Sequence, residues 1–229
     1  MRCKKSRWGS ACLTLIQVCA ALVCYGGAGC GANKAVVKHP GHSGTDESAD
    51  SDPQEESAPE LLPPEHEATE HVTIKTSLGD IVIGLYGADA PSTVKNFLGY
   101  VDRGFYSSKV FHRVIPGFMI QGGGFDAALS RAQTESAIKL EIIPGLKHEP
   151  GVVSMARTSD PNSATSQFFI CVGSAPQLNG GYAAFGKVEK GHEVVQAIAS
   201  VPTKTVELEN GPMADVPSDP VVIEAITRN

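Results

Sequence analysis

The sequence predicts a mainly β domain over residues 71–229, preceded by a segment that lacks the pattern of a folded domain. Three observations lead to this prediction. Many short runs alternate apolar with polar residues, two longer runs carry apolar residues at helical spacing, and turn-forming residues separate the runs. The pattern alone leaves all-β and α+β folds open, with a closed antiparallel sheet plugged by helices as the expected arrangement.

The domain opens with a predicted antiparallel hairpin and a helix. Residues 71–76 and 81–86 each alternate apolar with polar side chains, and the turn residues between them predict a hairpin. Pro91 suits the first position of a helix, and apolar residues follow it at helical spacing. Gly104 favours the end of this helix, because glycine readily adopts the left-handed conformation found there.

Two strands follow, joined by a well-specified turn. Residues 110–114 and 118–121 are β-forming runs on either side of Pro116-Gly117. Proline fixes φ at the first corner of a turn and glycine tolerates the second corner. We therefore expect these strands to lie side by side in antiparallel order.

Two polar residues interrupt these apolar strands. Because side chains alternate along a strand, Met119 and Gln121 are expected on one face, with Phe118 and Ile120 on the other. Arginine is rarely buried without a partner. Arg113 beside these apolar side chains therefore indicates an apolar cleft that holds one fixed cation and one amide.

The second half of the domain is predicted to alternate loops with strands. Residues 124–150 and 202–219 are loop-like in composition, the first with one short strand near 138–142. Apolar runs predict four more strands, and helical spacing after Gly191 predicts a second helix. The strands are 151–156, 167–172, 183–188 and 221–227, and the helix covers 192–199.

Three ordered blocks of sequence carry a family resemblance. The first is FHRVIPGFMIQGG at 111–123, the second combines 154–157 with 163–170, and the third is 185–188. In their order and spacing these blocks strongly resemble the cyclophilins, the peptidyl-prolyl cis/trans isomerases, over roughly residues 71–228. The resemblance implies a mainly β fold, a closed eight-stranded antiparallel β-barrel capped by two α-helices. It also implies isomerase activity that requires no metal and no cofactor.

The chemistry of this family explains why an arginine is needed. Rotation about an X–Pro bond breaks amide resonance, with a barrier of about 18–20 kcal/mol. In the twisted state the prolyl nitrogen regains a lone pair, so a cationic donor aimed at it stabilises that state selectively. By the resemblance, Arg113 is this donor and Gln121 holds its guanidinium in place. Phe118 completes the catalytic group.

The resemblance also assigns residues that bind the substrate. They would form the proline pocket or hold the peptide main chain, and they are Met119, Ala156, Arg157, Gln167, Phe169, Leu178 and Tyr182. His112, on the face of the strand opposite to Arg113, is interpreted as structural. Cys171 follows an apolar run and is interpreted as a small buried hydrophobe.

Three positions depart from the common cyclophilin pattern. Gln177 stands where many eukaryotic members have a tryptophan that lines the cyclosporin site, so tight cyclosporin binding is not expected. Arg157 replaces a common asparagine, and Tyr182 replaces a frequent histidine. The loop after Arg157 is similar to that of the bacterial branch of the family.

Residues 1–30 are predicted to be an export signal of the lipoprotein type. Four basic residues in the first seven precede an apolar run over 11–25, which is too short for a comfortable membrane span. Small residues then lead to Cys30, the expected site of lipidation, although Gly27 stands where the usual signal has leucine. Simple cleavage near Ala28 or Ala32 and an uncleaved anchor are the alternatives.

Residues 31–70 are predicted to form a disordered acidic linker. This segment holds ten acidic residues against two lysines and is poor in aromatic and β-branched residues, so it cannot bury enough apolar surface to fold. Its histidines lack the i, i+4 spacing of a zinc site. The linker would hold the domain away from a bacterial membrane, on its periplasmic or cell-surface side.

Three functions remain to be weighed. An exported isomerase, expected to be monomeric, would act on proline-containing peptides and unfolded proteins. A non-catalytic peptide-binding module or chaperone would use the same groove without turnover. A lipocalin-like barrel fits the strands but leaves Arg113 and Gln121 unexplained. The sequence carries no basic stripe for nucleic acid.

Overall fold

A computed structural model of the chain describes residues 66–209 and 211–229, which all lie within one compact unit. The helices and strands of this part are, in chain order, β1 (Glu70–Thr76), β2 (Gly79–Leu85), α1 (Pro91–Asp102), β3 (Lys109–Ile115), β4 (Met119–Asp126), β5 (Val152–Met155), β6 (Phe168–Cys171), the 3-10 turn η1 (Pro176–Leu178), β7 (Ala184–Lys190), α2 (His192–Ala199), β8 (Thr203–Leu208), β9 (Gly211–Pro217) and β10 (Val221–Arg228).

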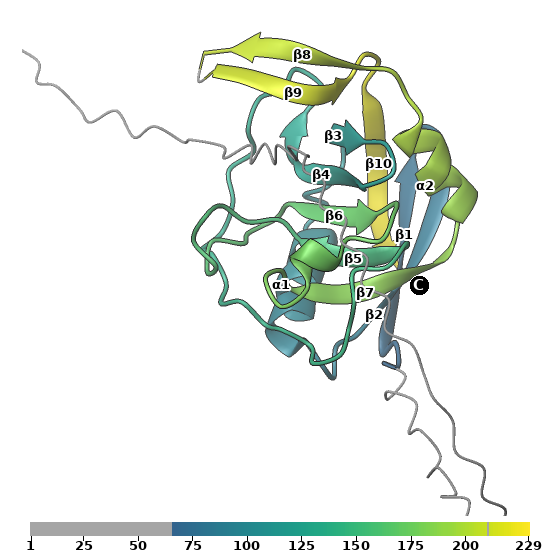
Figure 1. Ribbon diagram of the computed structural model, residues 1–229, viewed down its shortest axis with the longest axis vertical. Coiled ribbons are helices and arrows are strands. Elements are labelled where there is room, and N and C mark those ends of the chain that lie inside the picture. Colours follow the sequence, from purple (N-terminus) through teal and green to yellow (C-terminus); the bar gives the residue numbers. More distant parts are fainter. Residues whose placement is uncertain (1–65, 210) are drawn as a thin grey trace, which may run out of the picture. The chain divides into compact units, whose positions relative to one another are not determined.

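Eight of these strands close into a barrel in the order β1-β10-β3-β4-β6-β5-β7-β2 (Figure 1). Every neighbouring pair is antiparallel, and the closure joins β1 to both β2 and β10. The predicted fold, an eight-stranded antiparallel barrel with two α-helices, is therefore confirmed.

Aromatic side chains fill one region of the barrel's core. Phe97 of α1 lies against Tyr106, Phe168 and Phe185, with ring centroids 5.3, 5.6 and 5.2 Å away. These rings are almost completely buried. Rings packed in this way fill this region of the barrel interior with side chains.

A distant loop caps the first helix. The Glu141 carboxylate accepts hydrogen bonds from the backbone N–H groups of Ser92 and Thr93 and from the Thr93 hydroxyl. Burial alone would raise the pKa of Glu141, but these hydrogen bonds outweigh it and lower the pKa below its usual value. The negative charge suits the positive end of the helix dipole and fixes the loop against α1.

The structure differs from the sequence prediction in three places outside the site. Residues 138–142 form no strand, because only Ile138 makes an isolated bridge, to Ala164. Residues 202–219 are largely the β8–β9 hairpin rather than a loop. The first strand begins one residue before the predicted position, since Glu70 opens β1, and Thr69 donates its N–H to the Leu85 carbonyl.

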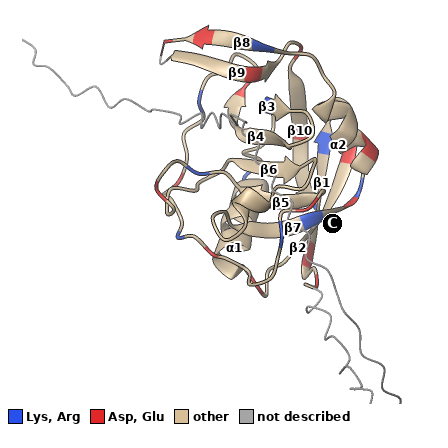
Figure 2. Cartoon of the chain, in the orientation of Figure 1, with Lys and Arg blue, Asp and Glu red and all other residues tan. Residues whose placement is uncertain are grey.

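The β8–β9 hairpin forms a separate two-stranded sheet, and its strand β9 packs against β3. Val216 of β9 is buried, and a cavity of about 170 Å³ lies between the hairpin and β3. Acidic and basic residues are interspersed along the hairpin and near α2 (Figure 2). The hairpin thus places polar side chains beside the strand that carries Arg113.

The predicted export signal, Cys30 and most of the predicted linker lie outside the described residues. Within the part of the chain that the structure describes, neither α-helix has the length and apolar character required to span a membrane.

Candidate active site

Strand register brings three of the predicted residues into one row. Arg113 of β3 pairs with Gln121 of β4, and Gln121 pairs with Phe169 of β6. Residues directly opposite each other on neighbouring strands have side chains on the same face, about 5 Å apart. The barrel therefore sets a cation, an amide and an aromatic ring side by side.

The row lies on the outer face of the barrel. Ile120, Phe168 and Ile170 belong to the main core, whereas their neighbours Met119 and Phe169 belong to a second, smaller apolar cluster. This alternation follows from the two-residue period of a strand. Two apolar layers thus share strands β4 and β6, one inside the barrel and one under the site.

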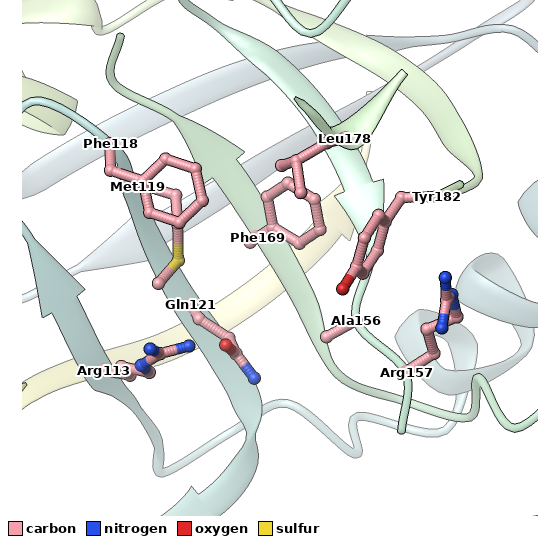
Figure 3. Close-up of a pocket in the computed structure, with 9 residues that line it drawn as sticks. All are labelled: Arg113, Phe118, Met119, Gln121, Ala156, Arg157, Phe169, Leu178 and Tyr182. Atoms are coloured by element: carbon pink, nitrogen blue, oxygen red, sulfur yellow. The ribbon is translucent and has the colours of Figure 1, made fainter. Parts of the chain in front are cut away.

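A cavity of about 190 Å³ opens over this second cluster (Figure 3). It draws residues from β3, β4 and β6 and from the segments that follow β5 and precede β7. The lining residues are Arg113, Phe118, Met119, Gln121, Ala156, Arg157, Phe169, Leu178 and Tyr182. These are the residues that the sequence assigned to the site, apart from Gln167.

Gln167 does not line the cavity, but it is hydrogen-bonded to Gln121, which does. The Gln121 Nε2 donates a hydrogen bond of 2.9 Å to the Gln167 Oε1. This bond uses the amide nitrogen of Gln121 and leaves its oxygen available, so the expectation that Gln121 holds the guanidinium of Arg113 stays a prediction. A Cβ at Gly124 would lie 2.5 Å from the Gln167 side chain, so a larger residue there would displace Gln167.

Arg113 is paired with a residue that the sequence did not predict. Its Nε lies 3.6 Å from the Oδ2 of Asp215 on β9, and both side chains are about two-fifths exposed, 42% and 39%. Its guanidinium extends toward Gln121 at the edge of the cavity (Figure 3). The cation that was expected at this edge is present, in addition to Arg157 on the cavity lining, but the acid that pairs with it comes from the unpredicted hairpin.

The apolar floor of the cavity is held by aromatic contacts. Phe169 is 4% exposed, stacks on His148 with centroids 6.1 Å apart, and meets Tyr182 edge-on at 5.7 Å. Phe118 lies in the cavity together with Met119, although strand alternation placed them on opposite faces. The alternation fails because β4 begins only at Met119 and Phe118 still belongs to the turn.

A buried polar network, which was not predicted from the sequence, supports the floor. His148 Nδ1 lies 3.0 Å from Asn179 Oδ1, and its Nε2 lies 2.9 Å from Ser154 Oγ. Because the Asn179 oxygen can only accept, His148 carries its proton on Nδ1 and accepts from the serine hydroxyl. Burial lowers the pKa of His148, which favours this neutral form.

Arg157 and Tyr182 form the opposite rim of the cavity. The Arg157 guanidinium lies 4.5 Å from the centre of the Tyr182 ring, and its Nε donates to the Gly181 carbonyl at 2.8 Å. The side chain also donates from Nη1 to the Thr158 carbonyl. These contacts hold Arg157 against the protein.

Gln177, which stands where many eukaryotic cyclophilins are expected to have a tryptophan, is exposed in η1 and does not line the cavity.

The two residues interpreted as structural are buried. His112 is 4% exposed and lies against Phe125, with centroids 4.6 Å apart; burial, with a contribution from nearby Arg113, lowers its pKa to about 4. Cys171 is fully buried beneath the floor, where burial and the charge of Glu149 raise the pKa of its thiol to about 12. At neutral pH neither group carries a charge.

Comparison with known proteins agrees with this fold and site. Residues 71–228 match the family described as cyclophilin type peptidyl-prolyl cis-trans isomerase/CLD. The chain is 48% identical over 160 residues to peptidyl-prolyl cis-trans isomerase A of Dickeya dadantii, covering 68% of this chain and 82% of that protein. It is 46% identical over 164 residues to peptidyl-prolyl cis-trans isomerase B of Escherichia coli, covering 68% and 98%.

Among solved structures, a cyclophilin type isomerase of Cryptosporidium parvum, crystallised in the presence of the dipeptide Ala-Pro, is similar with a TM-score of 0.59. It is 34% identical, covering 69% of this chain and 98% of that one. The barrel and its outer cavity thus define a cyclophilin-type isomerase. The chain belongs to the cyclophilin-type peptidyl-prolyl cis-trans isomerase family, and it catalyses the cis–trans isomerisation of the bond before proline.

Proposed function

We propose that isomerisation takes place in the cavity on the outer face of β4 and β6, where Arg113 stabilises the twisted amide. The observation that carries this proposal is the row of Arg113, Gln121 and Phe169 across three paired strands. The proline ring would lie on the apolar floor beside Phe169. The guanidinium would then face the prolyl nitrogen from the end of the same row.

The two parts of the site would act on different steps. Apolar burial on the floor binds the cis, trans and twisted forms alike, so it lowers KM without lowering the barrier. A charge-assisted hydrogen bond from Arg113 to the prolyl nitrogen forms only when the nitrogen becomes pyramidal. Such a bond contributes about 1.5–3 kcal/mol, a factor of roughly 10 to 150 in rate.

The expected substrates are proline-containing peptides and unfolded protein clients. The similar Cryptosporidium parvum protein was crystallised in the presence of Ala-Pro, which supports proline-containing peptides as the substrate class. The alternative, a peptide-binding module without turnover, would not require a cation at the edge of the floor. The presence of Arg113 therefore favours catalysis.

The test is Arg113→Ala in the full-length chain, assayed on an X–Pro peptide by exchange NMR. We expect kcat to fall about 10- to 150-fold with KM within about threefold of the wild-type value, because the contact forms in the transition state alone. Arg131→Ala, which removes an exposed arginine outside the cavity, should leave both constants unchanged. Full turnover in a folded Arg113→Ala protein would refute the role of the cation.

We also propose that the enzyme is exported, lipidated at Cys30 and held by residues 31–70 at the periplasmic or cell-surface side of a bacterial membrane, as a monomer. The support is the order of basic, apolar and small residues in the first thirty positions. Mass spectrometry of the mature N-terminus should find a lipid on Cys30, and Cys30→Ser should release the protein from the membrane fraction. An unmodified N-terminus beyond residue 30 would contradict lipidation.

A further inference from the structure

The acid that pairs with Arg113 lies on an irregular part of its hairpin. In the β8–β9 register Lys204 pairs with Val216, whereas Val206 pairs with Met213. Thr205 is thus the only residue between the two pairs on β8, while β9 has both Ala214 and Asp215 there. Two residues opposite one is the arrangement of a β-bulge, which turns a side chain away from its regular direction.

The backbone of Asp215 is also unusual. Its φ is 61°, in the left-handed region that non-glycine residues seldom occupy. Aspartate tolerates this region better than most residues, but the conformation is still unfavourable and persists only where the surrounding structure holds it. The neighbouring Val216 is buried, which anchors the hairpin and fixes the position of the bulge.

The bulge directs the Asp215 carboxylate to the Nε edge of Arg113, at 3.6 Å. Among residues 66–209 and 211–229, Asp215 is the one acidic side chain within ion-pair distance of this guanidinium. Gln121, the other candidate for holding it, donates from its amide nitrogen to Gln167 and could contact the guanidinium only through its oxygen. Contact at the Nε edge leaves the two terminal nitrogens free to act as donors toward the cavity.

We propose that Asp215 is a positioning residue for the isomerase reaction. By holding the Nε edge from the strained bulge, it restricts the long arginine side chain to the rotamers in which the terminal nitrogens face the bound proline. An arginine so held loses less conformational freedom when the transition state forms. The proposal rests on the assigned role of Arg113 and adds a second residue, from a different sheet, to that role.

The experiment compares three hairpin variants of the full-length chain. Asp215→Asn keeps the size of the side chain and removes its charge; we expect kcat to fall about threefold with KM unchanged, the size of effect typical of a partly exposed ion pair. Glu207→Gln removes an exposed charge from β8 of the same hairpin and should leave kcat unchanged. Asp215→Glu, which restores the charge, should recover part of the lost rate.

Asp215→Gly separates positioning from a merely structural role. Glycine accepts the positive φ without strain, so this variant should be at least as stable as the wild type in thermal unfolding. Its kcat should nevertheless fall about threefold, as for Asp215→Asn. A variant that gains stability while losing turnover cannot be explained by damage to the fold.

A spectroscopic readout tests the positioning itself. In ¹H–¹⁵N spectra of arginine side chains, the Arg113 Nε signal should show faster solvent exchange and a lower order parameter in Asp215→Asn than in the wild type or Glu207→Gln. An unchanged Arg113 signal together with unchanged kcat would overturn the proposal. If Arg113→Ala retains full turnover, the proposed role of the cation fails. In that case the Arg113 Nε signal still shows whether Asp215 orders the Arg113 side chain.

Discussion

His112 and Arg113 are neighbours in β3 whose side chains meet opposite environments. The guanidinium of Arg113 reaches the open cavity, while the imidazole of His112 is buried against Phe125. Transfer of a charged imidazole into such a site is unfavourable, so the folded protein keeps His112 neutral, with a pKa of about 4. In the unfolded chain the same group takes up a proton near pH 6.5.

We predict that this difference makes stability depend on pH. Below about pH 6.5 the unfolded chain binds a proton that the folded protein does not, so the free energy of unfolding falls as pH drops from about 6.5 to about 4. The loss due to His112 is on the order of 3 kcal/mol and is complete below its folded pKa. Urea unfolding of the wild type and of His112→Gln at pH 7, 5.5 and 4 measures this loss of stability.

The free energy of unfolding of His112→Gln should fall less steeply with decreasing pH over this window than that of the wild type. His148, whose pKa burial also lowers, contributes in the same direction to both proteins, so the difference between their slopes isolates His112. Equal slopes would contradict the prediction.

Single residues show where prediction from sequence works and where it fails. Arg113 and Gln121 could be predicted because they lie in one continuous motif with a recognisable order. Asp215 and His148 could not, since their partners Arg113 and Asn179 lie far away in the chain and no local pattern marks an ion pair or a buried network. Phe118 was assigned to the correct cavity, but its face was wrong because the first residue of β4 could not be fixed from alternation.

At the scale of elements, the β8–β9 hairpin was the main omission. Pro212, Pro217 and Gly211 resemble loop residues, and proline is compatible with a strand only where its missing N–H is not needed, as in a two-stranded sheet. The bulge at Asp215 further interrupts alternation. By contrast, α1 could be predicted almost to the residue, because Pro91 and regular apolar spacing mark it clearly.

The close contact between Gly173 and the turn at Gly117 should be sensitive to the addition of a single methyl group. A Cβ at Gly173 would lie only 2.1 Å from the carbonyl oxygen of Gly117, in the turn that carries Phe118. We predict that Gly173→Ala displaces this turn, lowers stability by about 1–3 kcal/mol and raises KM for a proline peptide. Denaturant unfolding and steady-state isomerisation kinetics would measure the two effects.

Gly99→Ala is the matched control. Gly99 lies inside α1, where the nearest atom to an added Cβ is Arg103 Nη1 at 3.8 Å. Alanine there should raise stability by about 0.5–1 kcal/mol and leave KM unchanged. A neutral Gly173→Ala would show that the 117–118 turn moves aside without consequence.

For the whole molecule, barrel closure depends on the first strand. β1 pairs with both β2 and β10, and its Val72 and Ile74 are fully buried. We predict that a fragment of residues 66–229 folds and keeps kcat/KM within about twofold of the full chain, because each cavity residue and its support lie within it. A fragment of residues 78–229 should fail to fold, since it loses the strand that closes the sheet.

Circular dichroism and peptide isomerisation of both fragments check this prediction, and activity in the shorter one would contradict it. The pattern suggested a closed sheet, but its eight-stranded form could be predicted only through the family resemblance. Alternating patterns show that strands exist, whereas they do not show that β1 returns to β10, a pairing between residues such as Val72 and Arg228 at opposite ends of the domain.

Because aromatic rings occupy the interior, the cavity residues face outward from a closed wall. A polypeptide can therefore lie sideways across the wall and be engaged at a proline in the middle of its length, with neither end threaded through an opening. A proline in a loop that protrudes from a nearly folded protein should then be isomerised as readily as one in a newly synthesised, unfolded chain.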